Sequence, residues 1–146
     1  MNNYLVMFLL FIAGTFVSLQ ASINARLAKY IGFLESAFVS FFIGTLTLLI
    51  FLFFKGFNNF KSITDVPVLY LSGGILGAFF VFMITYAVPK IGVSAALSIT
   101  IAVQLILGLL IDKYNPFNVS TFHISFLNIV GVIMIILGVL LITYNR

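Results

Sequence analysis

Five apolar runs constrain this chain more than any other feature of its sequence. Each run is about 20 residues long, enough for a helix to cross the hydrocarbon core of a membrane. Hydrophobic residues make up 63% of the chain and charged residues only 7%, whereas a soluble domain carries roughly 25% charged residues. We therefore predict an all-α membrane protein with five transmembrane helices, forming a single membrane domain over residues 1–146. The expected spans are residues 4–27, 33–54, 67–88, 93–111 and 124–144.

The basic residues are divided almost evenly between the two sides of the membrane. With five spans, three lie on the side of the N-terminus and four on the other side: Lys55, Lys61 and Lys113 against Arg26, Lys29, Lys90 and Arg146. Orientation is normally set by an asymmetry of Lys and Arg in short loops. The even division predicts insertion in both orientations, and an antiparallel dimer with inverted pseudo-symmetry. The partner is a second copy or an oppositely oriented paralogue, unless the first span alone dominates orientation.

Small residues recur at four-residue spacing, which lets helices approach closely in lipid. The predicted packing positions are Gly14, Ser18 and Ser22 in the first span, Ser36, Ser40 and Gly44 in the second, and Gly73 and Gly77 in the third. In the last span Gly131 and Gly138 stand seven residues apart on one face. We predict that this pair forms a dimer seam, although packing within one chain fits the spacing equally well.

Amides and hydroxyls interrupt two of the apolar runs. Gln20 and Asn24 share one face near the end of the first span, and Gln104 lies near the middle of the fourth. On the fourth span a polar ridge is formed by residues spaced four apart: Thr100, Gln104, Gly108 and Asp112. Ser98 lies on a neighbouring face. These amides either join helices by hydrogen bonds or line a water-accessible cavity that binds a polar solute. Their number favours the cavity, with Gln20, Asn24, Ser98, Thr100 and Gln104 as substrate-binding residues.

Ionisable residues are absent from the central third of every predicted span. Because such residues usually mark proton relays, their absence argues against a carboxylate-centred proton antiporter. Glu35 and Asp112, near span ends, are candidates for a gate or a coupling group, or are simply solvated. Arg26 and Lys29 are expected to be interfacial anchors, and His123 to be exposed in a loop.

Signatures of enzyme chemistry are missing from the sequence. We find no glycine-rich phosphate loop, no metal-ligand cluster and no nucleophile with a neighbouring base, and the chain has no cysteine. We therefore predict a protein that is not an enzyme, with no cofactor, no metal site and no nucleic-acid partner.

Several segments, in this order, resemble a known family. They are "LQASINARLAKYIG", "SAFVSFFIGTL", "SGGILGAFFVF", "VPKIGVSAALSITIAVQLILGLLIDKYN" and "NIVGVIMIILGVLL". Together they resemble the YdcZ-like family of bacterial inner-membrane exporters, a five-span branch of the drug/metabolite transporter superfamily. The resemblance implies a half-transporter that pairs with an opposed half. One departure is Val103, where the family tends to carry glycine just before the Gln104 position.

Three functions are compatible with these features. The favoured one is a small secondary transporter, an exporter or exchanger of a small polar or cationic metabolite, working by alternating access in an antiparallel dimer. The first alternative is a small dual-topology ion channel. The second is a membrane assembly or lipid-handling subunit that transports nothing, in which the amides only join helices.

Overall fold

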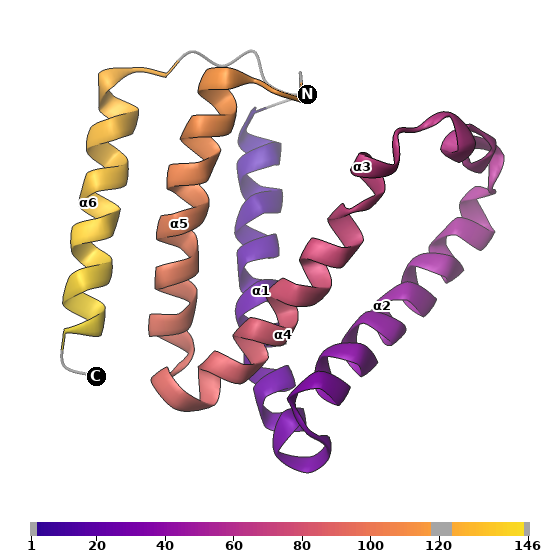
Figure 1. The fold of residues 1–146 in the computed structure, drawn as a ribbon, viewed down its shortest axis with the longest axis horizontal. Coiled ribbons are helices and arrows are strands. Elements are labelled where there is room, and N and C mark those ends of the chain that lie inside the picture. Colours follow the sequence, from indigo (N-terminus) through magenta and orange to yellow (C-terminus); the bar gives the residue numbers. More distant parts are fainter. Residues whose placement is uncertain (1–2, 118–123, 145–146) are drawn as a thin grey trace. The chain divides into compact units, whose positions relative to one another are not determined.

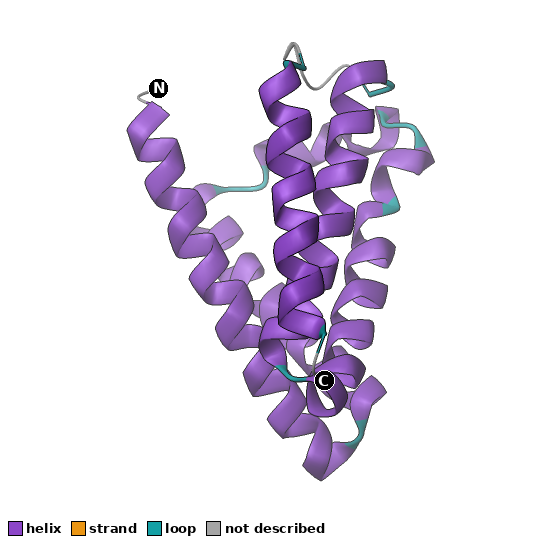
Figure 2. Cartoon of the chain, turned by 90° about the vertical axis from the view of Figure 1, so that its left-hand side faces the viewer, coloured by secondary structure: helices purple, strands orange, loops and turns teal. Residues whose placement is uncertain are grey.

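The computed structural model describes residues 3–117 and 124–144, and within these ranges all regular secondary structure is helical (Figures 1 and 2). Five helices are long and apolar enough to cross a membrane, so the prediction of five apolar helices is confirmed. They span Asn3–Ile31, Phe33–Lys55, Val68–Ile91, Val93–Tyr114 and Phe126–Thr143. The chain divides into two compact units, an N-terminal unit (Met1–Pro89) and a C-terminal unit (Lys90–Arg146).

Helices α1 (Asn3–Ile31) and α2 (Phe33–Lys55) are joined by a single residue, Gly32. Its φ of +96° lies in the region that glycine adopts most easily, so the chain reverses direction there without strain. The helix α1 therefore runs past the predicted boundary at residue 27. Its 29 residues measure about 44 Å, which exceeds the hydrocarbon thickness of about 30 Å. The end that carries Arg26 and Lys29 accordingly extends toward the headgroups.

The third span is not one uniform helix. Beyond α2, a 3₁₀-helix, η1 (Asn58–Asp65), leads to the short helix α3 (Val68–Leu71) and then to α4 (Gly73–Ile91). At the break, the hydroxyl of Ser72 donates a hydrogen bond of 2.6 Å to the carbonyl of Leu69. Such local bonds compete with the helical pattern. At its other end α4 continues past Pro89, where a turn was predicted, and ends at Ile91.

The C-terminal unit is a pair of helices, α5 (Val93–Tyr114) and α6 (Phe126–Thr143), which run antiparallel and contact one another (Figure 1). Gly92, with φ +81°, precedes α5, and Asn115, with φ +41°, follows it in the left-handed conformation of a helix cap. A capping box opens α6, in which Asn128 Oδ1 accepts hydrogen bonds from Ser125 N (2.8 Å) and Ser125 Oγ (2.7 Å).

Small side chains dominate the buried positions. In the N-terminal unit these positions are confined to the end of α1 near Gly32, the start of α2 and the second half of α4. They are Ala21, Asn24, Ala25, Ala28, Ser36, Ala37, Val81, Ile84, Thr85 and Val88. In the C-terminal unit only alanines of α5 are buried among the described residues (Ala95, Ala96 and Ala102), and α6 buries none over its described length. Large apolar side chains cover the outside, as expected of helices that face lipid.

Candidate functional site

Asn24 is the centre of a polar cluster between α1 and α2, which we define as Asn24, Ser36 and Ser40. The side chain of Asn24 is 4% exposed, and its Nδ2 donates a hydrogen bond of 3.2 Å to Ser40 Oγ. In the opposite direction, Ser36 Oγ donates a bond of 2.8 Å to the main-chain carbonyl of Asn24. The cluster therefore joins a predicted substrate-binding residue to two predicted packing residues, and holds the two helices in register near Gly32.

Helix α4 completes this end of the N-terminal unit. Its Tyr86 ring meets Phe33 of α2 edge-on, with ring centroids 5.2 Å apart. A Cβ atom placed on Gly77 would lie 3.4 Å from Cζ of Phe41, an ordinary contact distance. Gln20 and Asn24 of α1 line a small cavity together with Thr85 of α4. Thr85 is fully buried and was not singled out from the sequence, because a lone threonine in an apolar run carries no distinguishing signal.

The predicted polar residues of α5 lie in the C-terminal unit. The hydroxyl of Ser98 donates to the carbonyl of Ser94 (2.7 Å), and that of Thr100 donates to the carbonyl of Leu97 (2.9 Å). Both hydroxyls are thus satisfied by their own helix. Gln104 is different, since its side chain is exposed and makes no hydrogen bond to the described residues of its unit. Because α5 is a continuous helix, Thr100, Gln104, Gly108 and Asp112 share one face.

The two sets of amides belong to different units of the chain. Gln20 and Asn24 lie in Met1–Pro89, and Gln104 lies in Lys90–Arg146. The structure brings Gln20 and Asn24 to one cavity and keeps Ser98, Thr100 and Gln104 together on α5. That these two sets face one another stays a prediction.

The candidate gating carboxylates lie at helix ends. Glu35 is exposed in the first turn of α2, where its carboxylate folds back over Gly32 and fills the place a Cβ would take there. Asp112 is half-buried in the last turns of α5. Arg26 donates to the hydroxyl of Tyr30 (3.0 Å) and stacks over its ring at 5.3 Å, an arrangement typical of an interfacial pair. His123 lies outside the described residues.

Most of the predicted packing glycines make no close approach inside their own unit. A Cβ atom on Gly14, Gly44 or Gly73 would find no described atom of that unit within 4 Å. The hydroxyls of Ser18 and Ser22 are exposed and donate to the carbonyls of Gly14 and Ser18 in their own helix, at 3.0 Å each. A Cβ on Gly131 or Gly138 also meets open space within the described C-terminal unit. Contacts of these positions with another chain stay a prediction.

Comparison with known families agrees with the resemblance seen in the sequence. Residues 5–141 match the family described as "Putative inner membrane exporter, YdcZ". The chain belongs to the YdcZ family. The matched region includes nearly all of the five apolar helices, so this YdcZ-family chain is an integral inner-membrane protein, and the description supports a membrane transporter. Neither a comparison with curated proteins nor one with solved structures found a match.

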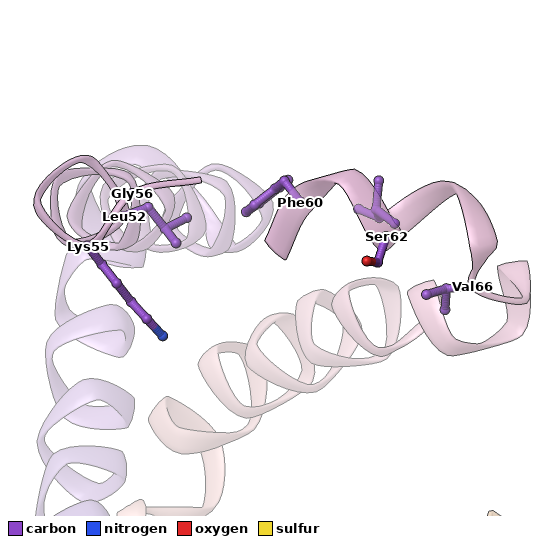
Figure 3. Close-up of a pocket in the computed structure, with 7 residues that line it drawn as sticks. Leu52, Lys55, Gly56, Phe60, Ser62 and Val66 are labelled. Carbon is purple, nitrogen blue, oxygen red and sulfur yellow. The ribbon is translucent and has the colours of Figure 1, made fainter. Parts of the chain in front are cut away.

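A second cavity lies where α2 of this YdcZ-family chain gives way to η1. It has a volume of about 350 Å³ and is lined by Leu52, Lys55, Gly56, Phe60, Ser62, Ile63 and Val66. Figure 3 shows Lys55 at the end of α2, and Phe60 and Ser62 on η1. One cation and one hydroxyl border an otherwise apolar wall. The cavity is about 22 Å along α2 from Ser40, at 1.5 Å per residue, so it is separate from the polar cluster.

Metal ligands do not gather in the part of the chain that the structure describes. Within residues 3–117 and 124–144, no three His, Cys, Asp or Glu side chains lie close enough to share a metal ion. In the central third of each span the polar side chains are amides and hydroxyls, which donate and accept hydrogen bonds without carrying charge.

Proposed function

We propose that this chain is a secondary transporter, an exporter or exchanger of a small polar or cationic solute. In this proposal two chains of opposite orientation pair in the membrane, as a homodimer or with a paralogue, and alternate access of a shared site between the two sides. The site is lined by Gln20 and Asn24 together with Ser98, Thr100 and Gln104 of α5. Each of these residues occurs twice in a homodimer.

One observation carries the proposal: Gln104 stands at the midpoint of the apolar helix α5, exposed and without a hydrogen bond to the described residues of its own unit. An amide left unsatisfied against lipid costs several kcal/mol. Gln104 therefore requires a polar partner outside the described C-terminal unit, either another helix, water or a solute. Asn24 differs, because Ser40 already satisfies part of its amide.

Gln20 strengthens the transporter proposal over helix joining alone. Its side chain is exposed while it also borders the small cavity beside Asn24 and Thr85. Gln20 is therefore accessible to a solute from outside the unit and offers it an amide for hydrogen bonding at the edge of the cavity. The near-even charge division, three basic residues against four, supports the antiparallel pairing.

Solute exchange by the purified protein tests the proposal directly. The protein is reconstituted in vesicles, and counterflow of radiolabelled ethanolamine, a solute with a hydroxyl and an ammonium group, is measured. We expect saturable exchange that falls at least tenfold in Gln104→Leu, because the amide that binds the solute is lost. The matched control is Val103→Leu, which changes an exposed apolar neighbour. Equal exchange by Gln104→Leu and the wild type contradicts the proposal, and currents far above exchange turnover identify a channel.

Orientation is tested separately with cysteine labelling. The natural chain has no cysteine, so Tyr4→Cys and Tyr144→Cys each introduce a unique reactive group. Labelling of sealed inside-out and right-side-out vesicles with an impermeant maleimide reports which side each end occupies. We expect about equal labelling from both sides for each variant, since the charges give little orientation bias. If each variant is labelled from one side alone, the homodimer is contradicted, and the opposed partner is then a paralogue of the opposite orientation.

A further inference from the structure

Thr85 of α4 is an exception among the buried polar side chains. It is fully buried, and its Oγ1 makes no hydrogen bond to any described protein atom. Ser36 is equally buried, yet its hydroxyl donates to the carbonyl of Asn24. Because buried polar groups are almost always hydrogen-bonded, the orphaned hydroxyl of Thr85 indicates a partner other than these protein atoms.

The main chain at Thr85 carries a second interruption of the helical pattern. In a regular helix, the carbonyl of Thr85 would accept a hydrogen bond from the N–H of residue 89. That residue is Pro89, which lies inside α4 and has no N–H to donate. In membrane helices, carbonyls freed in this way are tolerated where they are satisfied by neighbours or ordered water. The turn at Thr85 is thus the one place on α4 where a hydroxyl and a carbonyl both lack their ordinary helical partner.

The cavity beside Thr85 has the size of one small group. Its volume is about 10 Å³, and a cavity of roughly 10–15 Å³ on this measure holds one water molecule if two to four polar groups surround it. Three polar side chains border it: Thr85 from α4, and Gln20 and Asn24 from α1. The Nδ2 of Asn24 is bonded to Ser40, whereas its Oδ1 makes no hydrogen bond to the described residues. A hydroxyl and two amides therefore offer donors and acceptors to one small guest.

We propose that Thr85, Gln20 and Asn24 form a binding site for a single hydrogen-bonding group of the size of water. In the resting protein the group is one water molecule that bridges α1 and α4. During transport, and here the inference rests on the proposed function, the hydroxyl or primary ammonium group of the solute replaces that water. The site thereby selects solutes with a slender polar end and rejects quaternary ammonium ions, which are larger and donate no hydrogen bond.

Thermal unfolding in detergent tests the resting site. Thr85→Val removes the hydroxyl while keeping the shape of the side chain, and Thr85→Ser keeps the hydroxyl. If a bound water satisfies Oγ1, Thr85→Val lowers the melting temperature by several degrees and more than Thr85→Ser does. If the hydroxyl has no partner, Thr85→Val raises the melting temperature and overturns the proposal. The matched control is Thr47→Val on α2, where the hydroxyl is exposed and bonded to the carbonyl of Ile43, and no shift is expected.

Competition in the vesicle assay tests the transport step. We expect unlabelled ethylammonium to inhibit ethanolamine counterflow at least tenfold more strongly than tetramethylammonium does, and Thr85→Val to abolish this preference. If the preference survives in Thr85→Val, the solute does not use the site, and that half of the proposal fails. The two failures are separable. Vesicles that exchange nothing refute the proposed function while the melting test stands, and a raised melting temperature with normal exchange refutes the Thr85 site alone.

Discussion

The pair α1–α2 and the pair α5–α6 use polar side chains in opposite ways. Between α1 and α2, Asn24 and Ser36 are buried and bonded across the helix interface. On α5, the hydroxyls of Ser98 and Thr100 bond to their own helix, and the amide of Gln104 is exposed. Within the described residues, α6 adds no buried side chain. The first pair therefore uses the polar cluster of Asn24, Ser36 and Ser40 to join its two helices, whereas on α5 the amide of Gln104 is left exposed.

An amide in a span therefore has two distinct uses, and the burial of its side chain distinguishes them. A buried amide with a partner on the next helix fixes the register of that helix pair, at an average of about 0.6 kcal/mol per bond. An exposed amide at the middle of a span stabilises nothing in its own unit and demands a partner from elsewhere. Variants of Asn24, Ser36 and Gln104 test that separation through their effect on stability, and a variant of Gly138 tests the predicted seam of α6.

Asn24→Leu is expected to have the largest effect. The change removes the donor to Ser40 and places a branched apolar side chain in a position that is 4% exposed. We expect the free energy of unfolding in detergent to fall by about 1–3 kcal/mol. The control, Ile23→Leu, alters a neighbouring side chain that is 63% exposed and leaves stability unchanged. If the two variants unfold with the same free energy, the side chain of Asn24 does not stabilise the interface between α1 and α2.

Ser36→Ala is expected to have an intermediate effect. It deletes the hydrogen bond to the carbonyl of Asn24, so the free energy of unfolding falls by about 0.6–1.7 kcal/mol. Ser22→Ala is the matched control, because that exposed hydroxyl bonds to the carbonyl of Ser18 in its own helix. A cost for Ser22→Ala as large as for Ser36→Ala would show that the interhelical bond is not what stabilises the pair.

Gly138→Ala is expected to affect the stability of the isolated chain and the predicted dimer seam in opposite directions. A Cβ there meets no described atom of its own unit, so the substitution raises the stability of the isolated chain by about 0.5–1 kcal/mol. Because the seam requires close approach of two helices, we also expect a lower fraction of cross-linked dimer. Leu137→Val, at an adjacent exposed position, should leave that fraction unchanged. A dimer fraction unaffected by Gly138→Ala places the seam elsewhere.

Gln104→Leu is expected to have the smallest effect on stability. Its side chain is exposed and makes no bond within its described unit, so the free energy of unfolding of the detergent-solubilised monomer changes by less than about 0.5 kcal/mol. The same substitution is the one expected to stop solute exchange. A loss of stability comparable to that of Asn24→Leu would mean that Gln104 joins helices as Asn24 does, and the contrast between the two pairs would disappear.

The sequence predicts the helices well because crossing a membrane requires long apolar runs, and their lengths are readable directly. The boundaries are less readable. At the ends of α1 and α4, polar and charged residues predict turns before Gly32 and Gly92. The helices continue to Ile31 and Ile91, because at each of these two joints the positive φ that ends the helix falls on the glycine. The break at Ser72 depends on a local hydrogen bond that hydropathy does not report.

The site was predicted as a set of residues rather than as a geometry. The sequence predicts Asn24 as a binding residue and Ser40 as a packing residue, but their hydrogen bond depends on how α1 crosses α2. Thr85 was missed for a related reason. Its burial and its orphaned hydroxyl arise from the packing of α4, and neither is encoded in the spacing of the residues around it.

The one-residue joints at Gly32 and Gly92 also have a practical consequence. In a five-span topology both joints emerge on the same membrane face. Because each joint is a single residue, it gives a protease or an antibody almost no accessible loop to bind. Epitope tags and cleavage sites inserted between the spans therefore belong in the longer connection between Lys55 and Val68. In an antiparallel pair, each side of the membrane would carry the one-residue joints of one chain and the longer connection of the other. Proteolysis of intact vesicles from outside would then yield two fragment patterns from a single polypeptide.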